Sequence, residues 1–220
     1  MAFGINLNSS SGDIRAIIKY DARAGRIQRM DREDGVTIPT DITTNFTALF
    51  DFENAEKGWL FFAATGPDFK LVPLEPINGL WPEQPSDKHR QGVKIPLKLA
   101  GDCGGDVRDI ATVAKVSLQG LNQLHDAYLA HRNAHPGQLP IVILRSTRPI
   151  TTGTGVHKST NYEPQFEITG WAPRPADLPA KTQAPANGGF KQLDAPPATG
   201  ATKVGAPPAI RAPEATSDFG

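Results

Sequence analysis

The sequence has very little cysteine, no excess of charge of either sign and no long apolar run. Cys103 is the only cysteine among 220 residues, which excludes an internal disulfide framework and favours a reducing, cytoplasmic location. The 23 basic residues are balanced by 23 acidic ones, so net charge cannot be what attracts a nucleic acid. No segment approaches the roughly 18 apolar residues of a membrane span. The opening MAFGINLNSSSGD lacks both parts of a secretion signal, so we expect no membrane association.

The two ends of the chain differ in composition from its middle. Residues 1–12 are rich in Ser, Asn and Gly, which predicts a flexible N-terminus. Residues 177–220 consist mostly of Ala, Pro, Gly, Thr and charged residues, with too few large apolar side chains to offset the entropy cost of ordering. We therefore predict one folded domain over residues 13–176, followed by a disordered tail over 177–220.

The middle of the chain alternates apolar and polar residues, which is typical of strands. This pattern predicts hairpins over 13–32 and 44–64, a strand at 92–99 and a final hairpin over 139–171. The alternating aromatic residues of the second hairpin are assigned to the core: Phe46, Phe50, Phe52, Trp59, Phe61 and Phe62.

One segment has helical spacing instead. Asp106 follows two glycines and is the predicted N-cap, and apolar residues then recur at helical intervals from Val107 to Tyr128. The predicted fold is mainly β (α+β): an OB-like Greek-key barrel of five to seven antiparallel strands with one long helix, followed by the disordered tail. A twisted sandwich of six or seven strands would give a similar pattern.

Basic residues are concentrated in three segments and have aromatic residues among them. Proteins that bind single strands without sequence preference need both types, because cations follow the phosphates and aromatic rings stack on the bases. The candidate phosphate contacts are Arg15, Lys19, Arg23, Arg26, Lys88, Arg90, Lys94, Arg145 and Lys158. The candidate stacking residues are Tyr20, Trp81 and Tyr162. The alternative is that these cations are merely solvated and that Trp81 and Tyr162 pack on the core.

Lys158 lies in TTGTGVHKSTNY, residues 151–162, which superficially resembles a phosphate-binding loop. His157 stands where a P-loop has glycine, and a strand pattern follows where a P-loop has a helix. We therefore place Lys158 at the tip of a hairpin, where it would contact a phosphate of a bound strand.

No catalytic residue, metal site or cofactor is predicted, and we expect the protein not to be an enzyme. His131 and His135 have helical spacing, but no complete set of zinc ligands accompanies them. The one enzymatic pattern is Asp51, Asp68 and Lys70, which resembles the two acids and lysine of Mg²⁺-dependent nucleases.

The whole layout resembles the single-stranded DNA-binding proteins of tailed phages. The resemblance is carried by the basic and aromatic strand-rich middle and by NYEPQFEITGWAPRP, residues 161–175, just before the low-complexity tail. It implies an OB-like domain that binds single-stranded DNA in phage DNA replication or recombination, in the host cytoplasm.

The same resemblance implies that the tail recruits replication or recombination proteins. Its tip, PEATSDFG, has Phe219 near the end but only two acids. The alternatives to DNA binding are the nuclease and a non-enzymatic phage structural or host-interaction protein.

Overall fold

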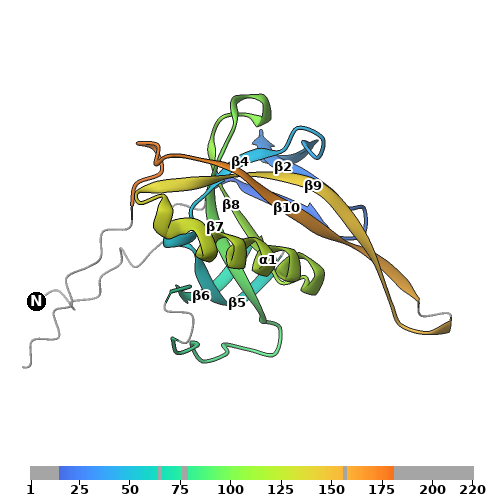
Figure 1. Ribbon diagram of the computed structural model, residues 1–220. Coiled ribbons are helices and arrows are strands. Elements are labelled where there is room, and N and C mark those ends of the chain that lie inside the picture. The colour runs from blue at the N-terminus through green and yellow to red at the C-terminus, as the bar shows by residue number, and fades with distance from the viewer. Residues whose placement is uncertain (1–14, 64–65, 76–78, 156–157, 181–220) are drawn as a thin grey trace, which may run out of the picture. The chain divides into compact units, whose positions relative to one another are not determined.

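The computed structural model describes residues 15–63, 66–75, 79–155 and 158–180 (Figure 1). The predicted flexible N-terminus and nearly all of the predicted tail lie outside these residues. The chain divides into units 1–182 and 183–220, and all described residues belong to the first.

Among the described residues the fold contains ten strands and one α-helix, so the prediction of a mainly β protein with one helix is confirmed. The strands are β1 (Ile17–Asp21), β2 (Arg26–Glu33), β3 (Val36–Asp41), β4 (Thr47–Phe50), β5 (Glu56–Ala63), β6 (Gly66–Pro73), β7 (Arg90–Leu99), β8 (Val107–Thr112), β9 (Gln138–Thr152) and β10 (Ser159–Pro173). The helix is α1 (Lys115–His131), and short 3₁₀ turns follow β4, β7 and α1: η1 (Phe52–Asn54), η2 (Gly101–Cys103) and η3 (Arg132–Ala134). No helix of the described part has the length and apolar character needed to cross a membrane.

The strands form one branched sheet in the order β10-β9-β4-β7-β8-β1-β2-β3. Strand β7 is the branch point, because its first half pairs with β5 and its second half with β4. The turn η1 separates these two partners, and β6 extends the branch beyond β5. The pair β1 and β8 is parallel, with Ile18 opposite Ile110, whereas the other strand pairs are antiparallel. The long β9–β10 hairpin projects past the other strands (Figure 1).

The core lies between the sheet and α1. Side chains at alternate positions of β7, among them Ile95 and Leu97, are buried, as the period of a strand requires. Leu121, Leu124 and Tyr128 form the buried stripe of α1, which packs against β10. The predicted core aromatics Phe46, Phe50 and Phe52 are at most 2% exposed, and this part of the prediction is confirmed.

The predicted start of the helix was wrong. Residues 107–112 form β8, paired with β7, and the helix begins at Lys115. Val107 and Ile110 have helical spacing and fall on opposite faces of the strand, but pairing with the extended β7 decides for the strand. Asp106 is therefore not an N-cap, and Gly104 and Gly105, with φ of 120° and 69°, form the turn before β8.

Two further features differ from the sequence-based prediction. Residues 36–41 form an edge strand, β3, which the sequence did not indicate because nearly all its side chains are exposed. Phe62, assigned to the core by alternation, is 46% exposed, since it lies near the end of β5 where no layer covers it.

The fold also extends past the predicted boundary at Asp177. Leu178 is 1% exposed, Asp177 pairs with Lys98, and the Pro179 carbonyl accepts a hydrogen bond from Asn54 Nδ2 at 3.0 Å. Composition missed these residues because a single buried leucine is enough to hold four residues against the sheet.

Candidate nucleic-acid interface

The predicted binding residues lie in separate parts of the fold. Trp81 and Lys88 contact the same face of β5, in what we call the Trp81 surface: Lys57, Trp59, Phe61, Trp81 and Lys88. Arg90 is paired with Leu60, so its side chain lies on the opposite face of β5. Tyr20, Arg23 and Tyr162 meet where β10 passes the β1–β2 turn. Arg15 and Lys94 line a cavity on β7 and β8.

Trp81 lies in the segment between β6 and β7 and is 43% exposed. Its ring meets Trp59 edge to face, with centroids 6.2 Å apart. The Trp59 indole N–H donates to the Pro82 carbonyl at 2.7 Å, which fastens this proline-rich segment to β5. Trp81 is thus held at the surface with part of its ring open to solvent, a position suited to stacking.

Cations lie close to these rings. Lys57 Nζ is 5.7 Å from the centroid of Trp81, and Lys88 Nζ is 5.9 Å from that of Phe61. Arg90 is exposed and donates to the Asp87 carbonyl at 2.8 Å. Cations at such distances are attracted to the ring faces. Lys57 is only 4% exposed, so the exposed Lys88 and Arg90 are the cations that can contact a phosphate here.

His89 anchors the same segment, a role that no sequence pattern indicated. The residue is 3% exposed, its Nδ1 lies 2.9 Å from Ser86 Oγ, and its ring packs on Phe61. Its Nε2 lies 3.3 Å from Asp68 on β6. These contacts hold Lys88 and Arg90, on either side of His89, at the surface.

Tyr20 does not fit the predicted stacking role. It is 8% exposed and belongs to the core, and its hydroxyl donates to the Tyr162 carbonyl at 2.8 Å. Burial, with the nearby charges of Asp21 and Glu163, raises the pKa of Tyr20 to about 12. Alternation on β1 places this ring inward, so it cannot reach a base.

Tyr162 is half-buried against the β1–β2 turn. Its backbone N–H donates to the Ala22 carbonyl at 2.7 Å. A Cβ on Gly25, where φ is +67°, would lie 3.0 Å from Tyr162 Cβ, so the turn closely approaches this side chain. Part of the ring is therefore used in packing, and its stacking on a base stays a prediction.

The remaining predicted cations differ in how they are paired. Lys19, Arg23 and Lys158 are exposed, and Lys158 lies at the β9–β10 tip, as expected. Arg26 instead pairs with Asp41 at 2.7 Å, and Arg145 with Glu167 at 3.4 Å. The paired cations attract a phosphate more weakly than the first three do, because their charge is already balanced.

The acids of the nuclease alternative do not form a metal site. Asp51 is fully buried, and both its oxygens accept hydrogen bonds from Arg174 and Asn54. Asp68 is exposed on β6 beside His89. Among the described residues no group of three or more His, Cys, Asp or Glu side chains is arranged to hold a metal ion.

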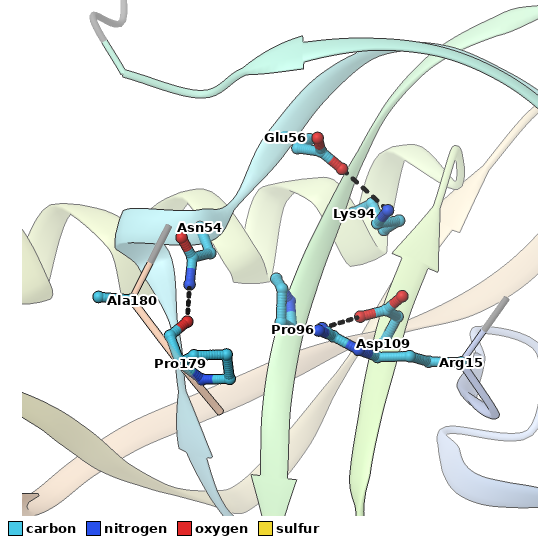
Figure 2. A pocket seen from close by; sticks show the side chains of 8 residues that line it. All are labelled: Arg15, Asn54, Glu56, Lys94, Pro96, Asp109, Pro179 and Ala180. Atoms are coloured by element: carbon cyan, nitrogen blue, oxygen red, sulfur yellow. Dashed lines mark hydrogen bonds and ion pairs between the residues drawn. The ribbon is translucent and has the colours of Figure 1, made fainter. Parts of the chain in front are cut away.

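Arg15 and Lys94 line a cavity of about 390 Å³ (Figure 2). Arg15 Nη1 lies 3.5 Å from Asp109 Oδ1 on β8, and Lys94 pairs with Glu56 across β7 and β5 at 2.8 Å. The acids Glu56 and Asp109 were not among the predicted site residues. They become neighbours of the cations only through strand pairing, which a single sequence does not display.

Comparison of the chain with protein-family models, curated proteins and solved structures gave no match.

Proposed function

We propose that this chain is a sequence-tolerant single-stranded DNA-binding protein that acts in phage DNA replication or recombination in the host cytoplasm. The observation that carries the proposal is the Trp81 surface. An exposed indole is fixed in place by Trp59, with Lys57 against its ring and the exposed Lys88 against the neighbouring Phe61. Stacking on such a ring is independent of base identity and contributes about 1–3 kcal/mol per base.

We further propose an OB-like arrangement of the sheet. In its support, β4, β7 and β8 are successive antiparallel neighbours, α1 follows β8, and β9 pairs back to β4. The hydrogen bond from Tyr162 to Ala22 links β10 to the turn after β1, whose strand pairs with β8. OB-folds bind oligonucleotides on their second and third strands and on two flanking loops. In this arrangement those strands are β7 and β8, and the loops carry Trp81 and Lys158.

Trp81→Ala tests the proposal most directly. Binding of a labelled oligo-dT, followed by fluorescence anisotropy, should weaken by about 1–3 kcal/mol because one stacked base is lost. Phe62→Ala is the matched control: Phe62 is 46% exposed, lies nearby on β5 and points to the other face of that strand. We expect less than a twofold effect from the control. Equal effects of the two changes, or none from Trp81→Ala, would contradict the assignment.

The salt dependence of binding tests the cations separately. Each phosphate neutralised on a single strand contributes about −0.7 to the slope of log K against log salt. Lys88→Ala combined with Arg90→Ala should therefore flatten the slope by about 1.4. Lys115→Ala, which removes an exposed cation at the start of α1, should leave it unchanged.

The same DNA incubated with Mg²⁺ separates the alternatives. Intact DNA that is bound supports the proposal, and cleavage would favour the nuclease. DNA that is neither bound nor cleaved would favour a structural or host-interaction protein. Replication or recombination proteins that bind the tail are a further part of the proposal, which a pull-down with the tail as bait would test.

A further inference from the structure

The cavity beside β7 and β8 combines charged and apolar walls. Its polar side chains are two cations, two acids and an amide: Arg15, Lys94, Glu56, Asp109 and Asn54. Pro96, Pro179 and Ala180 supply the apolar part, so residues just before the tail complete the wall (Figure 2). A volume of about 390 Å³ is in the range of small-molecule sites and is large enough for a mononucleotide.

Asp109 is the unusual member of this set. It is 7% exposed, and its Oδ1 is paired with Arg15 Nη1 at 3.5 Å but accepts no hydrogen bond at normal distance. Burial raises the pKa of this carboxyl, and the charges of Lys94 and Arg15 only partly offset that effect. A buried carboxylate oxygen without a donor is costly, and native structures rarely retain one without a reason.

The lining specifies the chemistry of a fitting ligand. Asp109 Oδ1 lacks a donor at normal hydrogen-bond distance, and the proline rings suit a flat apolar face. Arg15 is paired with Asp109 only at 3.5 Å, and its 39% exposed side chain can also face an anionic group. A nucleotide with an exocyclic amine has all three features. A carboxylate accepts from cytosine N4, whereas thymine presents a carbonyl oxygen at that position.

We propose that this cavity receives one nucleotide of the bound strand and that Asp109 accepts a hydrogen bond from the exocyclic amine of its base. This inference rests on the proposed function and adds a base preference at one position to otherwise sequence-tolerant binding. Glu56 lines the cavity, and the next residue, Lys57, contacts Trp81 from the opposite face of β5. The cavity and the Trp81 surface are therefore probed independently.

Oligo-dC and oligo-dT of equal length provide the first test, at neutral pH. We expect about three- to tenfold tighter binding of oligo-dC by the unaltered protein, the effect of one hydrogen bond. Asp109→Asn should remove or invert this preference, because its amide can donate to thymine O4. Asp126→Asn, which changes an exposed aspartate on α1 outside the cavity, should leave the preference intact.

Mononucleotides provide a second test that does not depend on strand binding. Millimolar dCMP should raise the Tm of the unaltered protein, with no rise for dTMP and none for Asp109→Asn. If oligonucleotides do not bind but dCMP stabilises the protein, the cavity assignment stands and the proposed function fails. If oligo-dC and oligo-dT bind equally and dCMP has no effect, the cavity assignment is overturned while the proposed function stands. If no oligonucleotide binds and dCMP also has no effect, both are overturned.

Discussion

Glu163 on β10 and Asp109 on β8 are both buried carboxylates, but their surroundings differ. Glu163 accepts hydrogen bonds from Arg148 Nη2 at 2.7 Å and from Gln123 Nε2 at 2.8 Å. Burial alone would raise the pKa of Glu163, yet these bonds and the Arg148 charge hold it below its ordinary value. Asp109 Oδ1 has no hydrogen bond of that length, because its ion-pair partner Arg15 Nη1 lies 3.5 Å away, and the pKa of Asp109 is raised. Glu163 is thus a buried carboxylate whose two oxygens both accept hydrogen bonds, and Asp109 is not.

The contact between α1 and β10, beside Glu163, should be the most sensitive of these points. A Cβ on Gly120 would lie 2.4 Å from the Pro164 carbonyl oxygen, and backbone cannot easily move away. We expect Gly120→Ala to lower the free energy of unfolding by about 3 kcal/mol or more, or to prevent folding. Helix propensity alone predicts the opposite, a rise in the free energy of unfolding by about 1 kcal/mol. Urea denaturation decides between them, and a variant as stable as the parent would disprove the close contact.

Ala130→Gly is the control for that experiment. Ala130 is exposed on the same helix, so only propensity changes, and a loss of about 1 kcal/mol is expected.

Glu163→Ala should have the next largest effect. It leaves Arg148 and Gln123 without their acceptor, but Arg148 is 56% exposed and can be solvated, so we expect a loss of about 1–3 kcal/mol. Glu167→Ala, on the same strand, removes only the exposed pair with Arg145 and should cost less than about 1 kcal/mol. Comparable losses in the two variants would show that Glu163 does not hold α1 to the hairpin.

The pH dependence of stability gives Glu163 a second signature. Because its pKa is lowered in the folded state, its contribution is present at neutral pH and is lost as the pH falls through the range where glutamate titrates. Glu163→Gln should therefore flatten the acid side of the curve of Tm against pH. An unchanged acid limb would contradict this.

The smallest effect on stability, and one of opposite sign, is expected for Asp109→Asn. A raised carboxyl pKa means that the folded state binds the proton more tightly than the unfolded state. The charged form therefore costs stability as the pH rises through the folded pKa. At neutral pH the amide should leave Tm unchanged or raise it by one or two degrees, a shift well under about 1 kcal/mol. A clear loss of stability would mean that the Arg15 pair has a structural role instead.

Local sequence patterns predicted part of this fold, and the remainder depended on which strands pair and which layers cover them. Alternation correctly placed Phe46, Phe50 and Phe52 in the core, and HPG correctly marked the end of the helical region. The same alternation failed for Phe62, because a pattern along one strand does not say where the covering layer stops.

The candidate site shows the same division. Trp81 and Lys88 were predicted from the sequence and contact the same face of β5, because they belong to one segment held by His89 and Trp59. Arg90 belongs to the same segment, but its pairing with Leu60 puts its side chain on the opposite face. Tyr20 was assigned to the surface and lies in the core, since the sequence did not reveal that β10 passes over β1. The acids Glu56 and Asp109 were missed, because their proximity to Lys94 and Arg15 arises from strand pairs distant in sequence.

The parallel pairing of β1 with β8 has a consequence for how the chain folds. The hairpins β1–β2 and β2–β3 pair residues close in sequence, so we expect them to form early. The other partner of β1 is β8, which is synthesised much later. Closing so long a loop is slow, because the chain loses conformational entropy before the stabilising contact forms. Until β8 pairs with β1, the outer edges of β1 and β3 are both unpaired. Val36 and Ile38 on β3 are exposed even in the folded protein. Pro39 removes one backbone donor from that strand, which limits unwanted pairing with other nascent chains during the wait.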